Sequence, residues 1–466
     1  MWWPEAVWGR WFCLVLTLLS ATVGLLFLAL KPTAFAQISA HAALPFSAHR
    51  EVIKFLRTAQ SARTPLPETT GHAIRGTKQP PDAQTPRGLR SCVEKCTASL
   101  APRKPREFPV EGLVQGYSQS KFWFPTGFDS FESIIRHDLR KVPNISKTMV
   151  DRAWCVGPDP FQGVVNWQMA NGSLLREHHR IGDQFEDRVN NGLRLLRKAL
   201  PLNKSRSGDV DMVLYWADIP PDLERGRLNP DRKCHPIHPF FVYQKQEALN
   251  NPSSMVFPDP GFVHWAEGRR KILTAAEKLT WSTKTGKLLF RGNDAGYRAA
   301  LDKKWLQKKY PASFDIFKVD VNDVKGRMSR DEQCNFKYLL YMPGFWGTIS
   351  TRLRWLMACG SVVVVPKHDW YEFFYPLLKP FEHFVPAGNM RLTRGHDLPC
   401  ITDCLRTHDE EAKQIAENAN RFVRDVLTED VAERYISLLF SVYSRHMGYN
   451  ASSFTTRDPT RCNCPK

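Results

Sequence analysis

Four consecutive valines, Val362–Val365, restrict the fold of this chain more than any other feature. A run of β-branched residues without polar alternation is typical of a strand buried on both faces, as in a parallel sheet between two layers of helices. Strand-like and helix-like segments alternate along the chain, with strands predicted at 210–216, 287–290 and 314–319 and helices at 185–200 and 352–359. We therefore predict an α/β fold with two lobes that join near residue 285 and bind ligands in a cleft, at the carboxyl ends of their strands.

The amino-terminal region contains a second long apolar run, Trp11–Leu30, which carries no charge and lies between Arg10 and Lys31. Twenty helical residues at about 1.5 Å each span a hydrocarbon core of roughly 30 Å. A cleaved signal peptide has a shorter apolar core, although Ala34-Phe35-Ala36 offers a cleavage site. We expect a signal anchor at 1–31 and keep a cleaved leader as the alternative. Both place the rest of the chain in the secretory lumen.

The cysteines and the glycosylation sequons agree with that compartment. Apart from Cys13 in the apolar run, the chain has ten cysteines, an even number that suits disulfides in an oxidising lumen. Three close pairs, Cys92/Cys96, Cys400/Cys404 and Cys462/Cys464, could instead bind zinc. However, they do not form two matched Cys-x-x-Cys pairs, and no histidine cluster accompanies them, so disulfides are favoured. The predicted glycosylation sites are Asn144, Asn171, Asn203 and Asn450.

Composition divides the rest of the chain. Residues 32–109 are rich in Pro, Thr, Ser, Ala and Arg and show no periodicity, so we predict a flexible basic stem there. Two α/β domains are expected to follow, at 110–285 and 286–450, with a tail at 451–466. The formal net charge of +18 indicates either a solvated basic surface or a site for phosphate-bearing ligands. Nucleic acid is an unsuitable partner, because the basic stem lacks interleaved aromatic residues and lies beyond a lumenal anchor.

Two segments have the residue types that bind anions. The first, Phe290–Arg298, leaves a strand, turns through two glycines and carries two arginines; glycine lets the backbone approach a ligand, and arginine offers a planar fork to phosphate oxygens. Arginines paired with carboxylates in an ordinary surface turn are the alternative. The second, Gly347–Gly360, places hydroxyl residues where a helix is expected to begin, and Arg352 in its first turn. A basic residue there opposes the helix dipole, which favours a functional role over a structural one.

The carboxyl-terminal half resembles a known family. Cys334-Asn335-Phe336-Lys337-Tyr338-Leu339, the segment from Ser350 to Ser361, and the long string Trp370–Pro380 are similar to Rumi-type protein O-glucosyltransferases and capsule-associated enzymes of glycosyltransferase family 90. The match is strong over about 285–450, looser over 150–285 and absent from the stem. It implies a GT-B-like fold of two Rossmann-like domains, with a UDP-sugar in the cleft and an inverting transfer, of glucose or xylose, that needs no essential metal.

The resemblance also implies roles for individual residues. The nucleotide sugar is expected to contact Arg291, Gly292, Asn293, Arg298, Ser350, Arg352 and Glu372. Asp218 and Trp265 are expected to line or support the acceptor side, and Cys334 and Cys359 to form a disulfide that braces the helix.

The catalytic base is where this sequence departs from the family pattern. The family has an Asp at the end of a short run that matches Leu174-Leu175-Arg176-Glu177-His178-His179 here, so His179 takes its position. Imidazole is able to act as a base, and Asp183 and Asp187 follow closely. An inactive relative that binds a glycan or glycoprotein is therefore the alternative to an active transferase.

Two further expectations complete the prediction. Asp209-Val210-Asp211 has the pattern of a metal-binding Asp-x-Asp, but it precedes a strand, where surface carboxylates are common, and we expect no metal there. We expect a single-pass type II protein of the Golgi or endoplasmic reticulum membrane, with a glycoprotein or glycan acceptor; the chain ends without a Lys-Asp-Glu-Leu-like tail, which favours the Golgi.

Overall fold

The computed structural model describes residues 87–98, 124–140, 142–155, 163–180, 185–203, 208–216, 239–246, 254–319, 327–344 and 348–457. All of them belong to one compact unit, Ala83–Lys466. The apolar run predicted as an anchor and most of the predicted stem lie outside these residues. Within the ranges just given, the structure has no helix that is both long and apolar enough to cross a membrane.

The first sheet is mixed rather than parallel, which corrects the prediction for the first lobe. Its strand order is β2-β1-β3-β4-β6. β1 pairs antiparallel with β2 and with β3, whereas β3, β4 and β6 run parallel. Asn171 and Gly172 join β1 to β2, and both have positive φ, as a tight two-residue hairpin requires. The strands are β1 (Val164–Ala170), β2 (Ser173–Arg180), β3 (Val210–Tyr215), β4 (Phe240–Val242) and β6 (Ser254–Val256).

The second sheet is fully parallel, as predicted, with the order β12-β10-β9-β7-β8. Its strands are β7 (Thr285–Gly292), β8 (Phe314–Lys318), β9 (Phe336–Leu340), β10 (Val362–Pro366) and β12 (Val385–Ala387). The chain builds from β7 to β8 on one side and then returns to place β9 on the other side of β7. The carboxyl ends of β7 and β9 therefore form a topological switch point, where sheets of this kind bind ligands.

The valines of β10 show why this strand lacks polar alternation. All four are completely buried, and successive side chains point to opposite faces of a strand. Val363 and Val365 belong to a hydrophobic core that also includes residues of the first sheet. Val362 and Val364 belong to a second core on the other face. Each face of the strand thus contacts its own apolar layer, which satisfies the sequence pattern.

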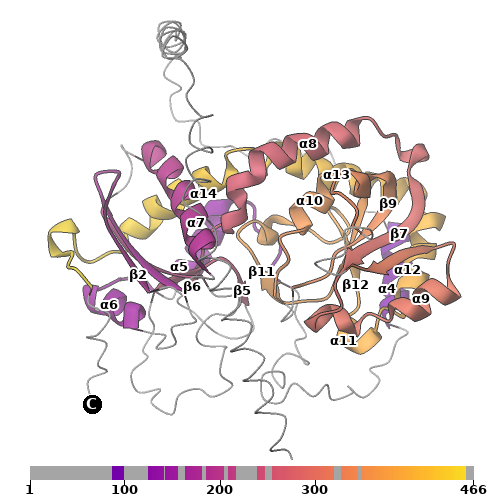
Figure 1. The fold of residues 1–466 in the computed structure, drawn as a ribbon, viewed down its shortest axis with the longest axis horizontal. Coiled ribbons are helices and arrows are strands. Elements are labelled where there is room, and N and C mark those ends of the chain that lie inside the picture. The colour runs from indigo at the N-terminus through magenta and orange to yellow at the C-terminus, as the bar shows by residue number, and fades with distance from the viewer. Residues whose placement is uncertain are drawn as a thin grey trace, which may run out of the picture. The chain divides into compact units, whose positions relative to one another are not determined.

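Helices cover both sheets, and Figure 1 shows α8 (Trp265–Glu277) and α13 (Asp409–Asp425) running beside the second sheet. α13 packs on β10 and on α10 (Leu353–Met357). The last α-helix of the described residues, α14 (Val431–Ser444), packs on β3 and on two helices of the first half, α5 (Phe131–Leu139) and α7 (Glu186–Ala199). The chain thus returns to the first half before residue 450. A short pair, β5 (Lys245–Gln246) with β11 (Trp370–Tyr371), also joins the two halves. After α4 (Arg87–Ala98), the other α-helices of the described residues are α6 (Lys147–Cys155), α9 (Lys303–Lys309), α11 (Met390–Thr393) and α12 (Leu398–Thr407).

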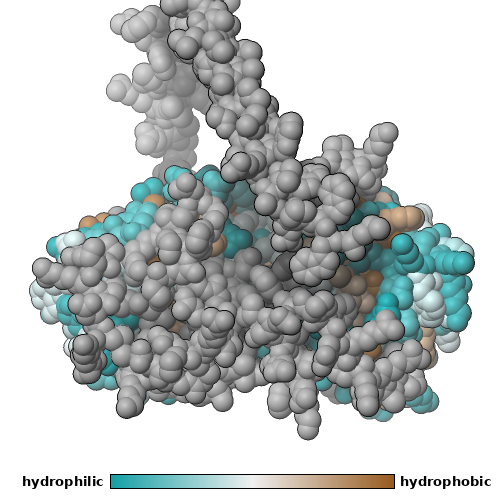
Figure 2. Space-filling model, turned by 60° about the horizontal axis from the view of Figure 1, so that its bottom comes forward, coloured by the Kyte–Doolittle hydropathy of each residue, from teal (hydrophilic) through white to brown (hydrophobic). Residues whose placement is uncertain are grey.

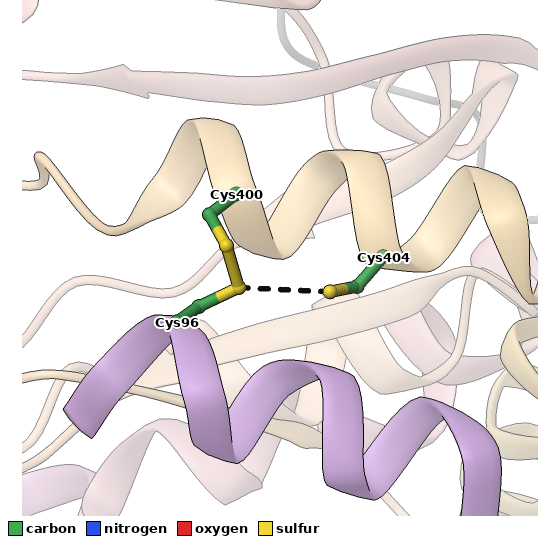
Figure 3. Close-up of side chains that lie close together, drawn as sticks. All are labelled: Cys96, Cys400 and Cys404. Carbon is green, nitrogen blue, oxygen red and sulfur yellow. Dashed lines mark hydrogen bonds between the residues drawn. A yellow bond between two sulfur atoms is a disulfide. The ribbon is translucent and has the colours of Figure 1, made fainter. Parts of the chain in front are cut away.

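Part of the predicted stem is a helix fixed to the body. α4 (Arg87–Ala98) lies against α12, to which the disulfides Cys92–Cys404 and Cys96–Cys400 join it. Figure 3 shows Cys96 bonded to Cys400, with its Sγ atom 3.6 Å from the Sγ atom of Cys404. Cysteines four residues apart lie on one face of a helix, so two such helices meet through both pairs. The sulfurs lie close enough for a metal site, but disulfide bonds occupy them. The disulfide prediction is confirmed for these four cysteines, and a flexible stem is wrong for residues 87–98.

We expect removal of one of these disulfides, with Cys92→Ser and Cys404→Ser together, to lower the free energy of unfolding by about 3 kcal/mol. The remaining Cys96–Cys400 bond still closes the loop of about 300 residues, so only the small ring between the two bonds is opened. Urea unfolding measures the change. A variant as stable as the parent chain would show that the Cys92–Cys404 bond adds no stability beyond that of the Cys96–Cys400 bond.

Candidate functional site

A cavity of about 550 Å³ lies between the two sheets. α7, the turn before α8, the chain after β9 and the start of α10 contribute its walls, so residues far apart in the sequence meet there. The lining residues are Asp187, Arg188, Asn191, Tyr243, Gln244, Asp259, Pro260, Gly261, His264, Arg330, Gly344, Thr348, Ile349, Thr351, Arg354 and Trp355. In Figure 2, the described surface not covered by grey atoms is mostly hydrophilic, with smaller hydrophobic areas between.

Three arginines gather beside this cavity at the switch point, a group we call the arginine cluster: Arg298, Arg330 and Arg352. The Nε atom of Arg298 donates to the carbonyl of Pro343, just after β9. Arg352 donates through Nη1 to the carbonyl of Arg291 at the end of β7 and through Nη2 to Oε1 of Gln333, at 2.8 Å. These bonds hold two guanidinium groups across the ends of β7 and β9, where a ligand of the second sheet is expected.

The charges of the arginine cluster are not balanced by carboxylates in the part of the chain that the structure describes. Burial, together with repulsion from Arg298 and Arg330, lowers the pKa of Arg352 to about 10. Burial also lowers the pKa of Arg298. Burial and the nearby positive charge of Arg354 together lower the pKa of Arg330. These guanidinium groups have lost part of their hydration and repel one another. An anion bound between them would stabilise their charged forms. The cluster therefore has the electrostatics of an anion-binding site.

Of the two arginines in the first predicted anion-binding segment, Arg298 belongs to the arginine cluster and Arg291 does not. The Nη2 atom of Arg291 lies 2.6 Å from Oδ1 of Asp315, and its guanidinium lies 4.8 Å above the ring of Phe317. Arg291 was predicted to contact a nucleotide, but its guanidinium forms an ion pair with Asp315. This is the alternative in which the arginine of a surface turn is paired with a carboxylate. Asn293 supports Arg298 by accepting from its Nη1 at 3.0 Å. Position 292 has no room for a larger residue than glycine, because a Cβ atom there would lie 2.6 Å from the ring of Phe290.

The second segment lacks the serine-capped helix that the sequence predicted. α10 is five residues long, begins at Leu353, and has Arg352 as its N-cap without a side-chain capping bond. Ser350 is buried, and its backbone N–H donates to the Tyr341 hydroxyl at 2.8 Å. That backbone donor is therefore already satisfied by the protein, and so short a helix adds little dipole. The positive charge at this site comes from side chains.

The predicted disulfide Cys334–Cys359 is confirmed, and it joins the segment before β9 to the end of α10. Lys284 lies behind it and donates from Nζ to the carbonyls of Cys334 and Cys359 and to Oγ of Ser361, at 2.7–2.9 Å. Burial lowers the pKa of this lysine to about 8. Together these bonds fix the segment that carries Arg352 and Arg354.

Glu372 lies beneath the cavity wall rather than in it. Its side chain is completely buried, and neither carboxylate oxygen has a hydrogen bond among the described residues. Nη1 of Arg354 lies 3.6 Å away, but burial outweighs this attraction and, with the nearby charge of Asp259, raises the pKa of Glu372 to about 8. Glu372 thus supports Arg354, and it is protonated at neutral pH.

We expect Glu372→Gln to flatten the dependence of stability on pH. Between its ordinary pKa of 4.5 and about 8, folded Glu372 keeps a proton that the unfolded chain releases. Stability of the parent chain therefore falls as pH rises through this window, by up to about 1.4 kcal/mol per pH unit from this group. Urea unfolding at pH 5, 6 and 7 measures the slope, and Glu382→Gln, which changes a half-exposed glutamate, is the control. Parallel profiles for parent and Glu372→Gln would contradict the assignment.

The structure separates the three candidates for the base. His179 is exposed at the end of the edge strand β2, where Nε2 lies 2.6 Å from Oε1 of Glu177, and it is not part of the cavity wall. Asp187 lines the cavity from the first turn of α7. Asp183 lies outside the described residues.

The predicted acceptor-side residues are only partly placed. Asp218 lies outside the described residues. Trp265 is completely buried and donates from Nε1 to the carbonyl of Leu427 at 2.9 Å. Its ring centroid lies 4.7 Å from that of Trp355, a residue of the cavity wall, so Trp265 supports the wall from behind.

The Asp-x-Asp motif and the sequons lie away from the cavity wall. Asp211 is completely buried and accepts from Nη2 of Arg457 and from the Tyr449 hydroxyl, while Asp209 accepts from the backbone N–H of Ala451. The motif thus fixes the carboxyl-terminal segment to β3. Asn144, Asn171 and Asn450 are exposed, as glycosylation requires, and the side chain of Asn203 lies outside the described residues.

Sequence reasoning missed most residues of the wall, among them Asp259, Arg330 and Arg354. Arg354 stood in a segment that the sequence had singled out, two residues after Arg352. Asp259 is followed by Pro260-Gly261, a turn signal, and its side chain caps that turn. Arg330 had no local signal, because only the tertiary fold brings it to Arg352.

Comparison with known proteins gives a consistent result. The family model described as "Glycosyl transferase family 90" matches residues 128–458. The chain is 28% identical over 338 residues to human protein O-glucosyltransferase 1, covering 63% of this chain and 79% of that protein. It is 24% identical over 379 residues to an O-glucosyltransferase rumi homolog of Anopheles gambiae, covering 74% and 85%. It is 30% identical over 263 residues to O-glucosyltransferase rumi of Drosophila pseudoobscura pseudoobscura, covering 52% and 62%. The chain therefore belongs to glycosyl transferase family 90, and it is a glycosyltransferase of the Rumi type.

Proposed function

We propose that this enzyme transfers a sugar, glucose or xylose, from a UDP-sugar to a hydroxyl group of a protein or glycan, with inversion and without an essential metal. The observation that carries the proposal is the arginine cluster at the switch point of the second sheet. Three guanidinium groups, of which those of Arg298 and Arg352 belong to partly buried residues, have no carboxylate partner among the described residues and suit a diphosphate. The two sheets around one cavity support a GT-B-like arrangement of two Rossmann-like halves, with the nucleotide on the second.

The reaction needs two kinds of assistance. As the bond between the sugar and UDP breaks, negative charge grows on the diphosphate, and the arginine cluster stabilises it. The attacking hydroxyl must lose a proton as it approaches the anomeric carbon, which requires a base in the cavity. We assign this role to Asp187, because of the three candidates only its side chain is seen in the cavity wall.

The acceptor and the compartment follow from other features. Relatives named protein O-glucosyltransferase favour a protein hydroxyl as acceptor. The disulfides, the exposed sequons and the apolar run at 11–30 support a lumenal enzyme held in the Golgi or endoplasmic reticulum membrane by a single type II anchor.

A donor screen tests this function. The purified full-length chain is incubated with UDP-glucose, UDP-xylose and other UDP-sugars, with and without EDTA, and released UDP is measured. We expect release from one or two donors, above all with a protein acceptor, and no effect of EDTA. If titration calorimetry shows that UDP itself does not bind, the proposed donor class is wrong. Loss of UDP release with EDTA would overturn the metal-independent mechanism.

A further inference from the structure

We propose that Asp259, Arg354 and Trp355 form a subsite that binds two adjacent hydroxyl groups of a pyranose ring. This inference rests on the proposed function, because it concerns the same cavity. It adds a second region to that cavity, chemically distinct from the arginine cluster.

The donors of this subsite lack partners. Arg354 is 1% exposed and Trp355 is 4% exposed, and both line the cavity. Nε of Arg354 and Nε1 of Trp355 have no hydrogen-bond partner among the described residues. The large majority of buried side-chain polar atoms in proteins have a partner, so two neighbouring unpaired donors in one cavity wall indicate a ligand that accepts hydrogen bonds.

The same wall offers an acceptor. Oδ1 of Asp259 accepts from the backbone N–H of Gly261 at 2.9 Å and from Nη2 of Arg354 at 3.1 Å. Its other oxygen, Oδ2, takes no hydrogen bond from the described residues, and Asp259 lines the cavity. A hydroxyl group both donates and accepts, so adjacent hydroxyls are able to donate to Asp259 and accept from Arg354 or Trp355.

The charge of this subsite separates it from a phosphate site. The positive charge of Arg354 is matched by Asp259, so a phosphate here would meet a carboxylate. The arginine cluster has no such carboxylate among the described residues. The ion-paired part of the cavity thus suits a neutral, hydroxyl-rich ring, whereas the cationic cluster beside it, of which Arg330 lines the cavity, suits a diphosphate.

Packing holds the subsite in place. The guanidinium carbon of Arg354 lies 4.0 Å from the centroid of the Phe262 ring and 5.3 Å from that of Trp355. A Cβ atom at Gly261 would lie 2.7 Å from Oδ1 of Asp259 and 3.1 Å from Nη2 of Arg354, so only glycine allows this close approach. Donors and acceptor fixed before the ligand arrives lose little entropy on binding.

The hydroxyls could belong to the donor sugar or to an acceptor sugar, and calorimetry separates the two. UDP, UDP-glucose and UDP-xylose are titrated into the parent chain and into Asp259→Asn, which still caps the turn at Gly261. If the donor sugar binds here, Asp259→Asn weakens the better-binding UDP-sugar at least 10-fold, and UDP less than 2-fold. Asp302→Asn is the matched control, because Asp302 also caps a helix and pairs with an arginine, Arg394, at 3.0 Å, away from the cavity.

An acceptor sugar gives a different pattern. UDP-sugar affinity then stays at the parent value in Asp259→Asn, and saturation-transfer NMR signals of methyl β-glucoside or methyl β-xyloside, measured with UDP present, fall at least 5-fold. Unchanged affinities and unchanged NMR signals would overturn the subsite. If UDP fails to bind the parent chain, the proposed function fails, and the NMR arm alone decides this inference. Trp355→Phe keeps the ring and removes only Nε1, so an expected 3- to 10-fold loss for the same ligand tests the subsite even if Asp259→Asn does not fold.

Discussion

Arg352→Ala is expected to lower kcat by a factor of about 100 to 1,000, the range measured when one pre-organised donor to a developing oxyanion is removed. Arg352 is partly buried, donates to the carbonyl of Arg291 and to Gln333, and repels Arg298 and Arg330. Its guanidinium group is therefore held in position before the substrate binds. It stabilises the transition state more than the bound substrate, because negative charge grows on the departing diphosphate. Steady-state UDP release measures the effect, and titration with UDP measures the accompanying loss of affinity.

Two variants make this result specific. Arg352→Lys keeps the charge but not the two-pronged geometry, so we expect an intermediate kcat. Arg394→Ala removes a half-exposed arginine that pairs with Asp302 on the surface, and it is the matched control. Full activity of Arg352→Ala would show that the diphosphate lies elsewhere.

Asp187→Asn is expected to lower kcat by a factor of about 100 to 10,000 while leaving UDP affinity within 2-fold of the parent value. The substitution keeps the size of the side chain and removes its ability to take a proton. Because Asp187 lies on α7 of the first half and the arginine cluster lies at the second sheet, binding of the nucleotide and activation of the hydroxyl are separable. Kinetics of UDP release with an acceptor, together with UDP titration, make that separation visible.

His179→Ala is the informative comparison, because the family resemblance predicts this residue at the position of the base, whereas the structure places it outside the cavity wall. We expect it to retain most of the parent activity. The reverse pattern, an active Asp187→Asn and an inactive His179→Ala, would move the base to His179. Activity in both variants would mean that neither residue takes the proton.

The sequence predicted the second sheet better than the first, for a physical reason. The strands of a buried parallel sheet are continuous apolar runs, and Val362–Val365 is such a run. β2 is an edge strand and contains Arg176, Glu177, His178 and His179, so it has no apolar run from which a strand is predicted. Asn171-Gly172, a strong hairpin signal, was present between two strand-forming segments and was sufficient to find β1 and β2.

The site shows the limits of local patterns. Arg298 and Arg352 were recognised as anion-binding candidates from the glycine and hydroxyl residues around them. Whether an arginine is paired depends on residues far along the chain, so Asp315 beside Arg291 was not foreseeable. The same holds for Asp259 beside Arg354, which are 95 residues apart.

The two bonds between α4 and α12 also have a consequence for how the protein is made. Cys92 and Cys96 leave the ribosome more than 300 residues before Cys404 and Cys400, a delay of roughly 15 to 60 seconds at 5–20 residues per second. During that interval their thiols are able to pair with each other but not with their final partners. Correct pairing must therefore follow synthesis of almost the whole chain, and a cell that makes this enzyme in quantity depends on thiol–disulfide exchange to correct early bonds.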